Sequence, residues 1–74
     1  MRVKVKLFAN FRIDRFKVSD RDYPGPVTVA DIITELCIPE PEVGIIFING
    51  RHAKTDTVLM EGDVLSLFPL VGGG

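Results

Sequence analysis

The group in this chain best suited to chemistry is the carboxylate of its last residue, Gly74, which follows Gly72 and Gly73. Glycine has no side chain, so this terminus can enter a slot too narrow for any Cβ atom and can adopt backbone angles closed to other residues. An α-carboxyl group has a reference pKa of about 3.5 and is ionised at neutral pH, so it can attack a phosphate without a local base. The glycines predict a tail, residues 72–74, that delivers its carboxylate to another protein; the alternative is an ordinary frayed end.

The residues before the glycines combine stiffness with apolar surface. Pro69 fixes its own φ angle and would give the tail a rigid base. Phe68 and Phe8 are out of phase with the residues expected to face the core, and two adjacent exposed rings would form a patch typical of a partner-binding site. Leu70 and Val71 would extend this patch. The alternative is that both rings pack beneath a neighbouring loop, such as 10–15 or 54–60.

Other side chains offer no catalytic or metal-binding arrangement, and we expect no bound cofactor. The single cysteine, Cys37, cannot form an internal disulfide, and its place eight residues after Val29 predicts a small buried hydrophobe. His52 has no second histidine or nearby cysteine with which to hold a metal, so we expect it at the surface.

Length, composition and charge limit the classes of protein to which this chain can belong. Seventy-four residues with 46% hydrophobic content suit one small domain, which buries about 60% of the surface of its unfolded chain. A net charge of −1 with interspersed signs gives no footprint for nucleic acid. No apolar run approaches the roughly 20 residues needed to span a bilayer, and the N-terminus is not a signal peptide. We expect a cytoplasmic domain that binds neither nucleic acid nor membrane.

The first third of the chain predicts a hairpin. Val3, Val5 and Leu7 alternate with polar residues and should face the core from a strand. An irregular turn at 10–15 leads to a short second strand that begins near Phe16 and Val18, and a loop follows at 20–26.

A short helix follows. Thr28 is a good N-cap, and Asp31 is a weaker substitute for the glutamate of a capping box. The apolar stripe of the helix is Val29, Ile32, Ile33 and Leu36, and Pro39 should end the helix. A helix this short is marginal alone in water, so the stripe must pack on a sheet.

The last third predicts the remaining strands. Residues 43–48 are almost wholly apolar, as expected of an interior strand, and Asn49-Gly50 predicts a tight hairpin into a brief edge strand at 51–53. A short apolar segment over the core at 58–60, a turn at 61–63 and a last strand at 64–68 complete the order, with Leu65 and Leu67 on one face of that strand.

This order resembles the ubiquitin-like β-grasp fold, an α+β fold that would occupy residues 1–71 as a mixed sheet of four to five strands packed on one main helix. The resemblance implies that the first and last strands are neighbours, which would bring Phe8 beside Phe68. More specifically, the chain resembles the MoaD/ThiS family of sulfur carrier proteins. The residues that carry the resemblance are Lys6-Leu7-Phe8-Ala9, Thr28-Val29-Ala30, Asn49-Gly50, and Glu61-Gly62-Asp63-Val64 leading to Leu67-Phe68-Pro69-Leu70-Val71-Gly72-Gly73-Gly74.

The chain has features of both branches of the family. Phe68-Pro69 and the long first hairpin are similar to the small subunit of molybdopterin synthase, although a second proline usually stands at the position of Leu70. The closing Val71-Gly72-Gly73-Gly74 also occurs in carriers for thiamine thiazole synthesis. The resemblance favours the molybdopterin type and leaves the thiazole type open.

The resemblance implies that a ubiquitin-activating-type adenylyltransferase uses ATP to adenylate the Gly74 carboxylate. Sulfur from a sulfur-donor protein then gives a thiocarboxylate, which donates sulfur to an acceptor such as the molybdopterin synthase large subunit or thiazole synthase. The chain would be a carrier and not itself an enzyme, although it would count as the small subunit of a molybdopterin synthase. Two alternatives remain: a ubiquitin-like modifier joined to lysines through Gly74, and a β-grasp interaction module with an inert tail.

Overall fold

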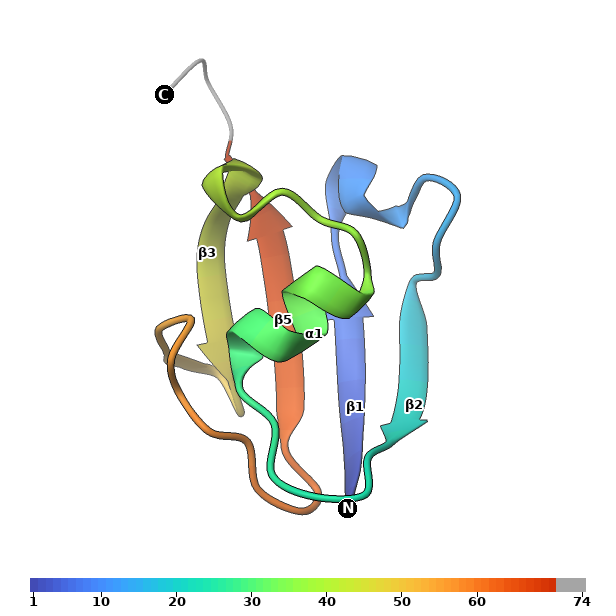
Figure 1. Ribbon diagram of the computed structural model, residues 1–74. Helices are drawn as coiled ribbons and strands as arrows, with labels where there is room; N and C mark the ends of the chain where they lie inside the picture. The colour runs from blue at the N-terminus through green and yellow to red at the C-terminus, as the bar shows by residue number, and fades with distance from the viewer. Residues whose placement is uncertain (71–74) are drawn as a thin grey trace.

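The computed structural model describes residues 1–70, which form a five-stranded sheet with one α-helix across one face (Figure 1). The strands stand in the order β2-β1-β5-β3-β4, with β1 parallel to β5 and the other pairs antiparallel. The elements are β1 (Arg2–Leu7), the 3-10 turn η1 (Ala9–Arg12), β2 (Val18–Asp22), α1 (Val29–Glu35), the 3-10 turn η2 (Glu40–Glu42), β3 (Val43–Ile48), β4 (Arg51–His52) and β5 (Val64–Pro69). The predicted mixed sheet on one main helix is confirmed.

The core lies between α1 and the two central strands. The side chains on this face of β1 and β5 have no exposed surface, because α1 covers them; they are Val3, Val5, Leu7, Leu65 and Leu67. From α1, the stripe residues Val29, Ile32 and Ile33 are buried against them, and Leu36 is half-buried. Burial of this stripe explains why so short a helix forms.

Both ends of α1 are capped. The Thr28 hydroxyl accepts a hydrogen bond from the Asp31 N–H (3.1 Å) and the Asp31 carboxylate accepts one from the Thr28 N–H (2.9 Å), so the predicted capping box is present. At the other end, the N–H groups of Cys37 and Ile38 donate to carbonyls in the preceding turn, at 3.0 and 3.1 Å. This is a Schellman motif, and it ends the helix before Pro39 does.

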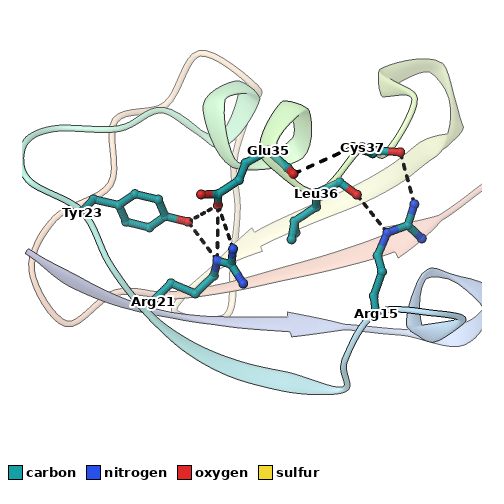
Figure 2. Close-up of polar contacts among 6 residues, drawn as sticks. All are labelled: Arg15, Arg21, Tyr23, Glu35, Leu36 and Cys37. Carbon is teal, nitrogen blue, oxygen red and sulfur yellow. Dashed lines mark hydrogen bonds and ion pairs between the residues drawn. The ribbon is translucent and has the colours of Figure 1, made fainter.

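The prediction of a buried Cys37 is wrong. The helix ends at Glu35, and Cys37 takes the left-handed conformation (φ +58°) that this motif places just after a helix. The chain therefore turns the Cys37 side chain out to solvent and buries Ile38. Arg15 satisfies the carbonyls left free by this turn, donating to the oxygens of Leu36 (3.0 Å) and Cys37 (3.2 Å) (Figure 2).

A second group of polar contacts joins α1 to β2 and to the residue that follows it. The Glu35 carboxylate accepts hydrogen bonds from the Arg21 guanidinium (3.1 Å) and from the Tyr23 hydroxyl (2.7 Å), as Figure 2 shows. Burial, and next the hydrogen bond to Glu35, raise the pKa of Tyr23 above its usual value. The contact fixes the end of α1 over the outer strand of the sheet.

The predicted loop at 20–26 begins too early, because β2 continues to Asp22. In the β1–β2 register, Asp20 lies opposite Lys4 and Asp22 lies opposite Arg2. The ion-pair distances are 3.4 Å for Lys4–Asp20 and 2.9 Å for Arg2–Asp22. Opposite charges directly across an antiparallel pair favour the strand, and they offset the low strand propensity of aspartate.

The tight turns are as predicted. Asn49 and Gly50 both have positive φ angles, +53° and +80°, which a two-residue hairpin turn of this kind requires. The hairpin joins β3 to β4, which ends at His52, one residue before the predicted end. The turn at 61–63 contains Gly62 with φ +83°.

Two segments outside the main elements add to the core. The irregular turn predicted at 10–15 is in part the 3-10 turn η1, and it buries Phe11, which the sequence analysis did not assign to the core. In the 58–60 segment Leu59 is buried as expected, whereas Val58 and Met60 are exposed. No helix within residues 1–70 is long and apolar enough to cross a membrane.

Candidate partner-binding site

Phe8 and Phe68 lie side by side on the open face of the sheet, which is the face opposite α1. The parallel register pairs Leu7, the last residue of β1, with Leu67 of β5, so the residues that follow them, Phe8 and Phe68, point to the open face at the same level. The two rings stack, with centroids 4.1 Å apart and an angle of 11° between their planes. Their predicted adjacency is confirmed.

A third ring, Phe47 of β3, completes an aromatic cluster that we define as Phe8, Phe47 and Phe68. The Phe47 and Phe68 ring centroids are 5.8 Å apart with the planes at 86°, an edge-to-face contact. All three residues are half-buried. The sequence did not predict that Phe47 lies at this site, because the unbroken apolar run at 43–48 shows no alternation. In the structure Phe47 pairs with Ser66, and both lie on the open face.

Two polar side chains border the aromatic cluster. The Arg12 guanidinium carbon lies 5.4 Å from the Phe8 ring centroid, and the Arg12 Nε donates a 2.7 Å hydrogen bond to the Leu7 carbonyl, which holds the cation in place. The exposed His52 ring, on β4, lies 4.7 Å from the Phe47 ring. The 10–15 segment therefore contacts the Phe8 ring through Arg12, whereas the alternative prediction had both rings beneath a loop, and Phe8 stays half-buried.

The aromatic cluster continues into the tail root, which we define as Pro69 and Leu70. Pro69 is the last residue of β5, and the Leu70 N–H donates to the Glu42 carbonyl at 2.9 Å. The Leu70 side chain is 50% exposed, and Ile45, which pairs with Phe68, is 43% exposed. Exposed apolar side chains thus lie both beside Phe68 and at the end of the described chain.

The remaining predicted site residues lie outside the described residues. They are Val71, the tail glycines Gly72 and Gly73, and Gly74 with its carboxylate. Within residues 1–70, no group of three or more histidine, cysteine or acidic side chains could hold a metal ion. A separate apolar hollow, lined in part by Met1, Pro26 and Met60, adjoins the start of β1, whereas Phe8 follows its end.

These features define a class of protein. A mixed sheet with parallel first and last strands at its centre and one helix across one face is the ubiquitin-like β-grasp fold. A family model described as the ThiS family matches residues 5–74, and the chain belongs to this family. The predicted membership of the MoaD/ThiS group is confirmed.

Solved structures support the same assignment. A Pyrococcus furiosus protein described as molybdopterin converting factor subunit 1 is 31% identical, with a TM-score of 0.75 over 96% of this chain and 99% of that one. SAMP1 from Haloferax volcanii is 26% identical, with a TM-score of 0.75 over the whole of both chains. The Helicobacter pylori complex of subunits 1 and 2 of molybdopterin-converting factor is 23% identical over the whole of both chains, with a TM-score of 0.66, and shows the fold alone. A comparison with curated proteins finds no match.

Proposed function

We propose that this protein is a sulfur carrier whose reactive group is the Gly74 carboxylate. In the proposed activation, a carboxylate oxygen attacks the α-phosphorus of ATP on a ubiquitin-activating-type enzyme, and pyrophosphate leaves. Sulfide (HS⁻) supplied by a sulfur-donor protein then attacks the carbonyl carbon of the acyl adenylate, a C–S bond forms, and AMP leaves with the C–O electron pair. The resulting thiocarboxylate donates its sulfur in cofactor biosynthesis. The chain acts as a protein cosubstrate in these steps, and the ATP binds to its partner.

The observation that carries this proposal is the ThiS-family match, which runs from residue 5 through the three glycines to residue 74. The described structure supports it. β5 ends at Pro69, and Leu70 is held against Glu42 by a backbone hydrogen bond, so the chain leaves the sheet from a fixed point beside the aromatic cluster. Because the proposed activation consumes ATP, we expect the protein to act in the cytoplasm.

We propose that the aromatic cluster and the tail root, with Val71 beyond them, bind these partners. Aromatic side chains and arginine are enriched in the centres of protein interfaces, and stacked Phe8 and Phe68 with Arg12 at their edge have that composition. The rings hold one another in place before any partner binds, which lowers the entropy lost on association.

The acceptor that we favour is a molybdopterin synthase large subunit, of which this chain would be the small subunit. The Pyrococcus furiosus relative is described as subunit 1 of molybdopterin converting factor, and the Helicobacter pylori structure contains subunit 1 with subunit 2. Thiazole synthase is the second acceptor that we propose, since the family model bears the ThiS name.

A second candidate function is protein modification, in which Gly74 forms an isopeptide bond with a lysine of a target protein. The likeness to SAMP1 over the whole of both chains favours it, because that protein is also described as small archaeal modifier protein 1. Both functions share the adenylation step and differ in the nucleophile that follows.

Intact-mass measurement separates these functions. The protein is incubated with the ubiquitin-activating-type enzyme of its own organism, ATP and a sulfur source, and a reaction without ATP is the control. Replacement of one oxygen by one sulfur supports the carrier, and adducts of higher mass in the presence of target proteins support the modifier. An unchanged mass would contradict both and leave a β-grasp interaction module.

A further inference from the structure

Gly44 lies where β3 meets the tail root. The β3–β5 register pairs Val43 with Pro69 and Ile45 with Phe68, so β3 advances two residues while β5 advances one. Gly44 is the additional residue, and the ladder is interrupted by a β-bulge at this point. Bulges of this kind bend a strand and redirect its neighbours.

No side chain fits at Gly44. A Cβ atom there would lie 2.9 Å from the Pro69 carbonyl oxygen and 3.0 Å from both the Cα and the N of Leu70. All three contacts are with backbone atoms, so no side chain can rotate away to make room. Among the described glycines, a Cβ on Gly25, Gly50 or Gly62 would meet nothing within 4 Å. Gly44 also lacks the positive φ of Gly50 and Gly62, so close approach is what requires a glycine here.

A hydrogen bond to the residue just before β3 also holds the tail root. The Leu70 N–H donates to the Glu42 carbonyl at 2.9 Å, and the ring of Pro69 fixes the φ angle of that residue. Glu42 and Gly44 therefore contact the backbone of two successive residues, Pro69 and Leu70. A Cβ atom at position 44 would have to push this backbone away by a few tenths of an ångström or more. Such a shift would directly disturb the hydrogen bond between the Leu70 N–H and the Glu42 carbonyl.

We propose that Gly44 is a positioning residue for the reactive terminus. Its missing side chain lets the backbone at Pro69 and Leu70 lie directly on the β3 bulge, and this contact sets the direction in which the chain leaves the sheet. The inference rests on the proposed sulfur-carrier function, since direction matters only if Gly74 must reach an active site. Gly44 contacts the tail root and not the aromatic cluster, so its main effect is on how the terminus is presented, and its effect on docking is limited to the tail-root part of the binding surface.

Steady-state kinetics of adenylation test this proposal. We expect Gly44→Ala to lower kcat with the activating enzyme by about 10- to 100-fold, because small misplacements of a reacting group have effects of this size. KM should rise by a smaller factor than kcat falls, because the aromatic cluster is unchanged and only the tail-root part of the docking surface shifts. Gly25→Ala is the matched control, since it adds the same methyl group in open space and should leave both constants unchanged.

Hydrogen exchange at the Leu70 amide gives an independent readout. We expect this amide to be protected in the wild-type protein and to exchange faster in Gly44→Ala. An unchanged kcat for Gly44→Ala, or an effect on KM alone, would overturn the proposal. If the variant does not fold, exchange of the wild-type Leu70 amide at the rate of an unstructured peptide would overturn it. If the wild-type protein is not adenylated, the proposed function fails, and the exchange comparison alone decides whether Gly44 holds the tail root.

Discussion

The two faces of the central strands, β1 and β5, differ in how deeply their side chains are buried, although the side chains of both faces come from the same stretches of chain. Toward α1, Leu7 and Leu67 have no exposed surface, and each belongs to one continuous core. Toward the open face, their chain neighbours Phe8 and Phe68 stack on each other and remain half-buried. One face is covered by α1, and this sealed face stabilises the fold. The other face keeps its largest apolar side chains partly accessible, at the end of the sheet where β5 ends.

The largest expected effect concerns the sealed face. Leu67→Ala removes a fully buried side chain and should lower the free energy of unfolding by about 2–5 kcal/mol, through lost burial and the cavity that remains. Denaturant unfolding measures this change. Ser66→Ala, on the adjacent residue of the open face, is the control and should change stability little. Equal losses for the two variants would mean that the faces do not differ in this way.

The next effect concerns the open face. Phe68→Ala should weaken binding of the activating enzyme by tenfold or more, which corresponds to about 1.4 kcal/mol. Its cost to unfolding should be below that of Leu67→Ala, because the Phe68 ring is half-buried. Calorimetric titration and denaturant unfolding of the same samples give both values. A variant as unstable as Leu67→Ala with unchanged binding would make Phe68 a core residue.

A smaller effect on stability is expected just after α1, the helix that covers the buried face of the sheet. Cys37 has φ +58°, a conformation that costs a residue with a Cβ more than it costs glycine. Cys37→Gly should therefore raise the free energy of unfolding by about 0.5–1 kcal/mol. Cys37→Val, whose branched side chain tolerates this conformation poorly, should lower it. Partner binding should not change in either variant, and a loss of stability in Cys37→Gly would contradict the Schellman geometry.

The smallest effect belongs to the exposed ion pair at the far end of the open face. The hydrogen bond from Arg2 lowers the pKa of Asp22 below its ordinary value of 3.8. The pair therefore stabilises the folded state above that pH, and its contribution is lost as the pH falls through the lower, folded-state pKa. Thermal midpoints of wild type and Asp22→Asn should differ slightly at neutral pH and low salt, and converge in acid. A difference that grows in acid would contradict this sign.

Much of the fold could be predicted because local chemistry determines it. The turn at Asn49-Gly50 needs two positive φ angles, and these residue types supply them. The capping box at Thr28 and Asp31 likewise depends only on residues three apart. The alternation of Val3, Val5 and Leu7 identified the buried face of β1 for the same reason.

The errors concern features that depend on distant residues. β2 extends to Asp22 because of its partners on β1, and that register cannot be known before the strands are paired. Cys37 continues the helical stripe in sequence, yet a Schellman motif ends the helix before it. Phe11 is buried from a 3-10 turn that has no periodic pattern.

The candidate site was predicted in part. The pairing of Phe8 with Phe68 followed from strand phase and from the expected neighbouring positions of the first and last strands. Phe47 and Arg12 were missed, because an apolar run conceals which side chains face outward and because a turn places Arg12 over Phe8. The steric role of Gly44 depends on a backbone contact across the sheet, which no local pattern shows.

The most direct test of the account compares the wild-type protein with a variant that lacks Gly74. Each is incubated with the activating enzyme, ATP and a sulfur source, and its intact mass is measured beside its thermal midpoint. We predict that the wild-type protein exchanges one oxygen for sulfur, and that the shortened variant does not although its midpoint is nearly unchanged, since glycine has no side chain to bury. Sulfur incorporation into the shortened variant, or a large fall in its midpoint, would contradict the assignment of the chemistry to the Gly74 terminus.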